Sequence, residues 1–156
     1  MDDTCAKEYI ANLEKEFSLI ENGFKEQEKR AFADYESNNN EHSKKLAFLA
    51  YKSNIYQVRM YSVFLFGYLS EQDDILAFMR DEVSKDDNWR VQEVLAKAFD
   101  EFCKQTGYEK ALPIIDEWLK TIILIRGEQL QRDLEYGRAD HISKIIRMKL
   151  SDELHH

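Results

Sequence analysis

Short amphipathic stretches alternate with polar breaks along most of the chain. Within each stretch, apolar residues recur at three- and four-residue steps, which is typical of helices that bury one face. The breaks are polar, and the clearest is the run Ser37 to Asn40. The pattern predicts helices over residues 2–22, 24–35, 41–51, 55–69, 71–83, 89–102 and 108–119. An all-α fold with short connections follows.

The predicted helices also repeat as a unit of short helix, polar break and long helix. Overlaying the long helices with an offset of 33 residues pairs Tyr56 with Trp89 and Phe66 with Phe99. Stacked helix pairs of this size bury a continuous core between neighbouring units. The repeat therefore predicts an α-solenoid of stacked antiparallel helix pairs, with an ordinary helical bundle as the alternative. In a solenoid the long helices are expected to line the concave face.

Composition supports this interpretation and indicates the compartment. A chain of 156 residues fits one domain, and its single proline and five glycines favour helices over turn-rich folds. Two cysteines are too few for a disulfide framework. The N-terminus carries acids where a signal peptide carries bases, and the apolar run 61–69 is too short to span a bilayer. We expect a soluble cytoplasmic protein with no membrane association.

Net charge bears on the class of partner. The formal net charge is −8. Residues 1–120 hold 24 acidic and 16 basic residues, whereas residues 121–156 hold 6 of each. Proteins that bind nucleic acids are usually basic on at least one face. The charge therefore argues against nucleic acid as a partner, unless the bases gather in a local groove.

The most informative stretch is DNWRVQEVLAKAFDEF, from Asp87 to Phe102. Asp87 and Asn88 suit a helix cap, and Glu93 follows Trp89 by four residues, so an indole and a carboxylate share one helix face. They are either a core tryptophan beside a surface acid or the two halves of a site. The four histidines show no ligand spacing and no Gly-rich phosphate loop is present, so neither a metal nor a cofactor is expected.

Two segments carry a resemblance to a known family. NWRVQEVLAKAFDEF, from Asn88 to Phe102, and GYEKALPIIDEWL, from Gly107 to Leu119, resemble the bacterial AlkD-like DNA alkylation repair proteins, which are built of HEAT-like repeats. The segment from Val58 to Leu69 is similar to the second helix of a HEAT repeat. The resemblance extends from about residue 5 to Lys120. It implies a HEAT-like repeat domain over residues 1–120.

The resemblance also implies a chemistry. Glycosylases of this family remove positively charged N3- and N7-alkylated purines from duplex DNA, which they hold in a basic concave groove. Their motif has a tryptophan and, four residues later, an aspartate. Trp89 matches the tryptophan, and Glu93 stands at the aspartate position with one more methylene. Glu93 and Trp89 are thus the implied catalytic residues of an alkylpurine DNA glycosylase.

Two further points remain open at this stage. Arg59 and Arg90 begin long helices near the expected groove and are candidate phosphate contacts, with a solvated arginine or an intrarepeat salt bridge as the alternative for each. The family also includes members without glycosylase activity that recognise unusual DNA structures. A non-catalytic protein that binds DNA structure or a protein partner is therefore the alternative to the enzyme, and glutamate at the aspartate position suits such a branch.

The resemblance ends abruptly after Lys120. The following residues, TIILIRGEQLQRDLEYGR, can form a helix but do not resemble the family. Back-translation in the neighbouring frame yields a coherent run of the kind that a family member carries at this point. Residues 121–156 are accordingly expected to be an atypical helical tail produced by a frameshift near 120–121. The tail either packs on the last repeat through the helical spacing of 142–150 or leaves an apolar end that drives self-association.

The coding DNA tests the frameshift. We expect close relatives to encode the family sequence in the neighbouring frame from about residue 121 onward. Relatives that encode the sequence TIILIRGEQL in an intact reading frame would contradict the hypothesis.

Overall fold

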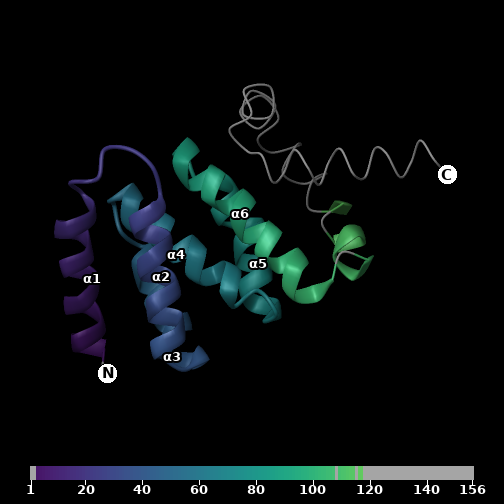
Figure 1. The fold of residues 1–156 in the computed structure, drawn as a ribbon, viewed down its shortest axis with the longest axis horizontal. Coiled ribbons are helices and arrows are strands. Elements are labelled where there is room, and N and C mark those ends of the chain that lie inside the picture. The colour runs from purple at the N-terminus through teal and green to yellow at the C-terminus, as the bar shows by residue number, and fades with distance from the viewer. Residues whose placement is uncertain (1–2, 108, 115, 118–156) are drawn as a thin grey trace.

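The structure, a computed structural model, describes residues 3–107, 109–114 and 116–117 (Figure 1). These residues form helices and contain no strand. Residues 109–114 and 116–117 are also helical. The helices are α1 (Asp3–Phe17), α2 (Lys25–Ser37), α3 (Asn40–Tyr51), α4 (Tyr56–Tyr68), α5 (Asp73–Asp81), the 3-10 turn η1 (Val83–Lys85) and α6 (Trp89–Thr106).

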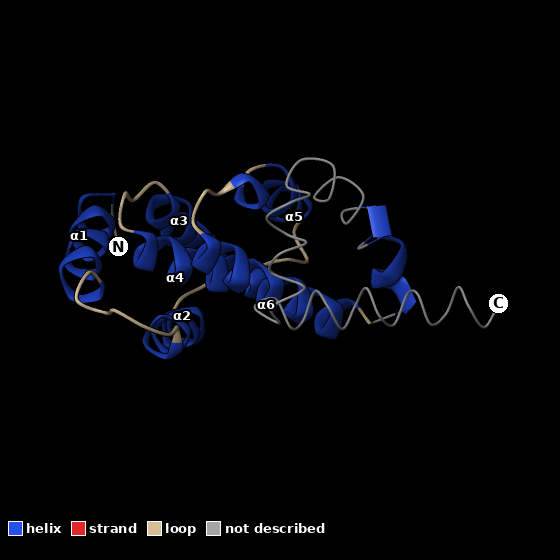
Figure 2. Ribbon diagram, turned by 90° about the horizontal axis from the view of Figure 1, so that it is seen from above, coloured by secondary structure: helices blue, strands red, loops and turns tan. Residues whose placement is uncertain are grey.

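The helices lie in two layers. Figure 2 shows α1, α3 and α5 along one side of the molecule, with α4 and α6 below them and α2 beneath α4. In the second layer α4 packs against α2 and α6, and across the layers it packs against α3. Along the long axis in Figure 1, α1 lies at one end, α2, α3 and α4 follow, and α5 and α6 lie beyond them. The predicted all-α solenoid of stacked helix pairs is confirmed.

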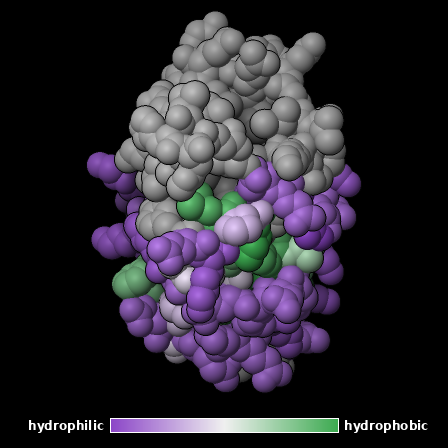
Figure 3. All heavy atoms as spheres, turned by 90° about the vertical axis from the view of Figure 1, so that its right-hand side faces the viewer, coloured by the Kyte–Doolittle hydropathy of each residue, from purple (hydrophilic) through white to green (hydrophobic). Residues whose placement is uncertain are grey.

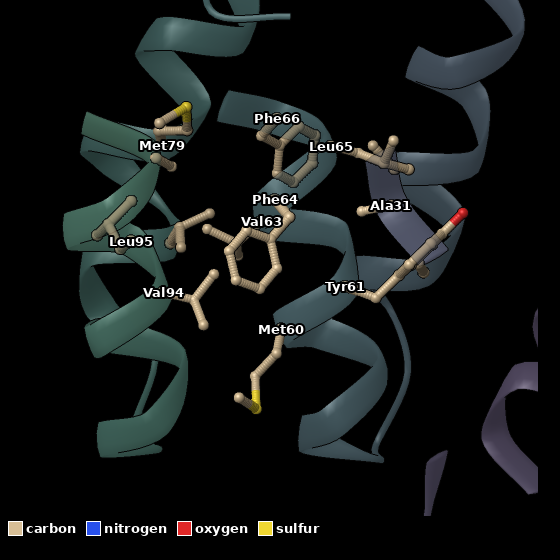
Figure 4. Close-up of a cluster of buried hydrophobic side chains, with 14 of the residues drawn as sticks. Ala31, Met60, Tyr61, Val63, Phe64, Leu65, Phe66, Met79, Val94 and Leu95 are labelled. Carbon is tan, nitrogen blue, oxygen red and sulfur yellow. The ribbon is translucent and has the colours of Figure 1, made fainter. Parts of the chain in front are cut away.

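Helix α4 is the centre of the core because it is apolar on almost every side. A helix that is hydrophobic all round is stable only when other elements cover it. All of its residues from Met60 to Gly67 are buried. In Figure 4, Val94 of α6 faces Val63 and Phe64 of α4. Helices α4 and α6 also lie close together at Gly67, where an added Cβ would lie 3.0 Å from Cα of Ala98.

Aromatic rings join α3, α4 and α5. The Phe48 ring lies 5.1 Å from the Phe66 ring and 4.9 Å from the Phe78 ring, both edge-on. Tyr51 places its ring 5.4 Å from Phe78. Edge-to-face pairs at such distances contribute roughly 0.5–1.5 kcal/mol beyond the area they bury. This cluster therefore holds α3 and α5 against α4.

A carboxylate of α2 joins three helices at the other end of the core. Tyr9 of α1 donates its hydroxyl hydrogen bond to Oδ2 of Asp34 at 2.5 Å, and Tyr61 of α4 donates to the same oxygen at 2.6 Å. Burial, together with the Asp34 carboxylate, raises the pKa of Tyr9 to about 12. The same two causes raise the pKa of the buried Tyr61 phenol. Both phenols are thus held in their neutral, donating form.

Several predicted boundaries differ from the structure. Helix α1 ends at Phe17 instead of near residue 22. The next residue, Ser18, donates its hydroxyl hydrogen bond to the Lys15 carbonyl at 3.1 Å, and Gly23 in the following loop has a φ of +83°. Helix α6 continues to Thr106, four residues beyond the prediction, and stops where Gly107 has a φ of +92°. The described residues of the predicted helix 108–119 are helical. The tail 121–156 lies outside the described residues.

The end of the molecule that carries residues 109–117 faces the viewer in Figure 3. Among the described atoms, hydrophobic side chains gather near the middle of this face and hydrophilic ones lie around them. Self-association through this end stays a prediction, since its last segment lies outside the described residues. No helix in the described part of the chain is both long and apolar enough to cross a membrane.

The tyrosines around Asp34 predict how stability changes with pH. A phenol whose pKa is raised on folding stabilises the native state fully below its unfolded pKa of about 10, and this contribution is lost as pH rises through the folded value. For Tyr9 the folded value is about 12. The free energy of unfolding, measured by urea denaturation, is therefore expected to decrease as the pH is raised from about 10 to about 12. In Tyr9→Phe the decrease is expected to be less steep. Parallel pH profiles for the two proteins would exclude a contribution from Tyr9.

Candidate nucleic-acid interface

The first turns of α6 carry three of the four predicted site residues. The helix begins as the sequence suggests, with the Asn88 side chain accepting a hydrogen bond from the Arg90 backbone N–H at 2.9 Å. Val91, Val94 and Leu95 are buried against the core, and the helical period turns Trp89, Arg90 and Glu93 away from that buried face. Trp89, Arg90 and Glu93 are accordingly half-buried. They lie at the surface of the α2–α4–α6 layer.

A buried carboxylate fixes the loop that leads into α6. The Asp86 side chain is 4% exposed, and its Oδ2 accepts hydrogen bonds from Nε of Arg59 at 3.0 Å and from the Tyr51 hydroxyl at 2.8 Å. Its Oδ1 accepts from the Asn88 backbone N–H at 3.0 Å. The Gln92 side-chain amide of α6 donates to the Asp86 carbonyl at 2.8 Å. Asp86 therefore ties the start of α6 to α3 and α4.

Arg59 is part of this cluster. Besides Nε, its Nη2 lies 3.3 Å from Oδ1 of Asp86, and its Nη1 donates to the Ser53 carbonyl at 3.0 Å. The side chain is only 15% exposed. Arg59 is thus in a salt bridge rather than solvated, but the bridge joins α4 to the loop before α6 and so connects neighbouring repeats, instead of lying within one repeat as the sequence-based alternative supposed. A guanidinium has five N–H groups, so Arg59 could contact a phosphate only through the N–H groups that do not bond to Asp86 or Ser53.

Arg90 stacks on aromatic rings. Its guanidinium carbon lies 4.4 Å from the centroid of the Trp89 ring and 5.3 Å from that of the Tyr56 ring. Both distances are within the roughly 6 Å over which a cation is attracted to a ring face. The Trp89 ring is therefore a surface that holds a planar cation in the structure itself.

Glu93 lies between two cations along α6. Arg90 precedes it by three residues and Lys97 follows it by four, and these spacings place side chains on one helix face. The Lys97 ammonium lies 4.3 Å from the centroid of the Phe24 ring, at the beginning of α2. Trp89, Glu93 and two cations backed by aromatic rings thus form one strip on α6, which we call the α6 strip: Trp89, Arg90, Glu93 and Lys97.

Beyond Lys97 the same layer becomes acidic. A shallow depression of about 150 Å³ lies between α2, α4 and α6, and Glu28, Asp100 and Glu101 are among its lining residues. Burial, with the charges of Glu28 and Glu101, raises the pKa of the Tyr68 phenol in this depression to about 12. Lys104, which also lines it, pairs with Asp100 at 3.5 Å. The three carboxylates thus outnumber the two lysines, Lys97 and Lys104, that line this depression.

Sequence reasoning missed three residues of this region: Tyr56, Lys97 and Asp86. A signal existed for Tyr56, because the 33-residue overlay of the long helices pairs it with Trp89, and Arg90 indeed lies over both rings. Asp86 gave no signal, since nothing in an Asp-Asp-Asn loop tells which carboxylate is buried. Among the residues that the structure describes, no group of three or more His, Cys, Asp or Glu side chains could hold a metal ion.

The Asp86 cluster predicts a large loss of stability for Asp86→Ala. Removing one member of a buried ion pair leaves the other charge and its hydrogen-bonding partners unpaired, at a cost of about 3 kcal/mol or more. Asp87→Ala is the matched control, since that neighbouring side chain is 95% exposed and its loss is expected to change stability by no more than about 0.5 kcal/mol. Urea denaturation of both variants measures the difference. Equal stabilities would show that Asp86 does not hold the loop.

Comparison with solved structures gives two close matches. The chain is 76% identical to AlkD2 from Streptococcus mutans in a crystal structure, over 74% of this chain and 56% of that chain, with a TM-score of 0.73. It is 51% identical to smu.31 from Streptococcus mutans UA159, also a crystal structure, over 90% of this chain and 79% of that chain, with a TM-score of 0.71. The match thus spans little more than half the length of AlkD2.

A scan against protein-family models and a search of curated proteins each found no match. The similarity to the two solved structures nevertheless combines high identity with the same helical-repeat fold, and for smu.31 it covers most of both chains. The resemblance read from the sequence around Trp89 is thereby confirmed. The chain belongs to the AlkD-like family of DNA alkylation repair proteins.

Proposed function

We propose that this chain is a DNA repair protein of the alkylpurine DNA glycosylase type, which hydrolyses the N-glycosidic bond of N3- or N7-alkylated purines in duplex DNA. One observation carries the proposal. Trp89 and Glu93 lie on one side of the start of α6, and the Trp89 ring holds a planar cation 4.4 Å from its centroid. An alkylated purine is also a planar cation.

The chemistry needs a carboxylate beside such a cation. When the glycosidic bond breaks, its electron pair goes to the base, which leaves neutral, and the sugar carbon develops oxocarbenium character. We propose that the Glu93 carboxylate stabilises this charge, orients the water that adds to the sugar carbon and accepts the proton that the water loses. Trp89 contributes a cation–π attraction of roughly 0.5–2 kcal/mol to the base before it leaves.

Cations near the site would hold the duplex. Arg90 is proposed as a phosphate contact, because its guanidinium lies at the surface and is retained by rings. Arg59 is proposed as a second one, with the N–H groups that Asp86 and Ser53 do not use. The larger contribution of Arg59 to the proposed site is indirect, because its ion pair with Asp86 fixes the loop before α6.

Release of methylated purines from methylated duplex DNA, followed by chromatography, tests the proposal. The parent chain is expected to release them, and Glu93→Gln to be slower by about 100-fold or more, as when one charge-stabilising group is removed from an active site. Glu93→Asp restores the residue of the family motif and is expected to retain activity. Glu101→Gln is the matched control, two turns further along α6, and is expected to release bases at the parent rate.

Equal rates for the parent and Glu93→Gln would remove Glu93 from the mechanism. Absence of release by the parent chain would favour the second candidate, a non-catalytic protein that recognises DNA structure or a protein partner. The short basic strip and the net charge of −8 favour this candidate. DNA affinity that falls steeply with salt would indicate the DNA-binding form, and absence of salt-dependent DNA binding would indicate a protein partner.

A further inference from the structure

Three aromatic rings meet where α2 lies beside the end of α4. The Tyr68 ring of α4 packs edge-on against the Phe32 ring at 5.8 Å, and the Tyr35 ring stacks on it at 5.2 Å. Phe32 is 50% exposed, although it packs against another ring. Among the described residues the only other exposed large hydrophobic side chain is Leu19, in the loop between α1 and α2. Phe32 thus belongs to an exposed aromatic cluster and is not a single apolar residue on a polar surface.

Glutamates surround these rings. Glu28 and Glu36 lie one helical turn before and one after Phe32, on the same face of α2. Glu28 also lines the depression beside Tyr68, together with Glu101 of α6. Within the described part of the chain, neither Glu28 nor Glu36 forms an ion pair. We call this set the Tyr68 patch: Glu28, Phe32, Tyr35, Glu36, Tyr68 and Glu101.

The two lysines that line the depression have partners outside the patch. Lys104 pairs with Asp100 at 3.5 Å, and the Lys97 ammonium lies 4.3 Å from the centroid of the Phe24 ring. The carboxylates of the patch therefore keep an excess of negative charge beside its rings. An exposed apolar cluster with a charged rim is typical of a protein–protein contact.

Gln105 fixes part of the patch across two helices. Its side-chain amide nitrogen donates to the Tyr68 carbonyl at 3.2 Å and to Oε1 of Glu101 at 3.3 Å. The Glu101 carboxylate is thereby held beside the end of α4. A surface whose groups are positioned in advance loses less conformational entropy when a ligand binds.

We propose that the Tyr68 patch binds an arginine-rich segment of a protein partner. The proposal goes beyond the function proposed above and does not depend on it, because the patch contains none of the residues assigned to base release. It names a partner by its chemistry: arginine side chains that stack on the rings and pair with the glutamates.

The chemistry of arginine fits both halves of the patch. A guanidinium is planar and weakly hydrated, so it stacks on aromatic faces, and its fork of N–H groups matches a carboxylate. Rings and carboxylates lie side by side here, so one arginine can use both. The depression of about 150 Å³ beside Tyr68 is small, which suits single side chains better than a folded domain.

Charge argues against nucleic acid on this patch. An exposed ring such as Phe32 can stack on a base, but single-stranded nucleic acids also need cations along their backbone. The patch offers three carboxylates instead, which repel phosphates. The net charge of −8 likewise attracts a basic partner over a longer range.

Fluorescence anisotropy of fluorescein-labelled hexa-arginine, titrated with the full chain in about 0.15 M salt, tests the proposal. Phe32→Ala and Glu28→Gln are each expected to weaken binding about two- to fivefold, because one loses a cation–π contact and the other an ion pair. Labelled hexalysine is expected to bind about two- to fivefold more weakly than hexa-arginine, since an ammonium does not stack as a guanidinium does.

Two matched controls separate the patch from general attraction to an acidic chain. Glu26→Gln removes the same charge from α2, but the helical period puts Glu26 on another side of the helix from Glu28. Leu19→Ala removes an apolar side chain that is 80% exposed and lies outside the patch. Both variants are expected to bind hexa-arginine as the parent does. Circular dichroism spectra identical to that of the parent establish that all variants are folded.

Absence of hexa-arginine binding by the parent chain would overturn the proposal. Equal affinities in Glu28→Gln and Glu26→Gln, together with equal affinities in Phe32→Ala and Leu19→Ala, would overturn it as well, because net charge alone would then explain binding. Hexalysine binding as tight as that of hexa-arginine would exclude stacking and have the same consequence. A labelled single-stranded oligonucleotide whose binding depends on Phe32, or a dimer in sedimentation velocity that Phe32→Ala dissociates, would assign the patch to nucleic acid or to a second copy instead.

Discussion

Burial of α4 on all sides is the constraint on which the rest of this structure depends. The helix carries Val63, Phe64, Leu65 and Phe66 in one unbroken run, so no orientation of it can leave an apolar face toward water. Covering it requires α3 on one side and α2 and α6 on the others. The two-layer arrangement in Figure 2 is the consequence. Because α6 covers one face of α4, the position of the candidate site follows from the packing of the core.

The same dependence explains why polar groups gather where α6 begins. The core fixes the rotation of α6, but its start must also be held in place along the helix axis. Asp86 does this by accepting hydrogen bonds from Tyr51 of α3, from Arg59 of α4 and from the backbone of Asn88. Each donor is satisfied by one buried carboxylate, so the desolvation of that charge is offset by directed bonds. Trp89 and Glu93 therefore belong to a rigid element, as a catalytic or binding pair requires.

The negative net charge of the chain conflicts less with the proposed DNA binding than its size suggests. Charge acts over a Debye length of about 8–10 Å, so the local arrangement matters more than the sum. On the described face the two cations of the α6 strip, Arg90 and Lys97, flank Glu93 and are backed by aromatic rings. The acidic residues of this face lie further along, around Tyr68. The proposed cationic substrate would meet aromatic rings and one carboxylate at the start of α6.

The sequence by itself determined the helices, their repeat and the family. Hydrophobic spacing identifies the buried face of each helix because the period of the α-helix is a local property. The amino-acid sequence from Asn88 to Leu119 was specific enough to identify the family. Helix ends were less accurate: α1 stops at Phe17 although the apolar spacing continues to Ile20, because hydrophobic spacing does not record where a helix ends. The tertiary structure alone decided which polar groups meet. Arg59 could face solvent or Asp86, and Arg90 could extend toward solvent or lie over the ring of Tyr56. Each outcome depends on contacts between residues about 30 positions apart, which no local pattern encodes.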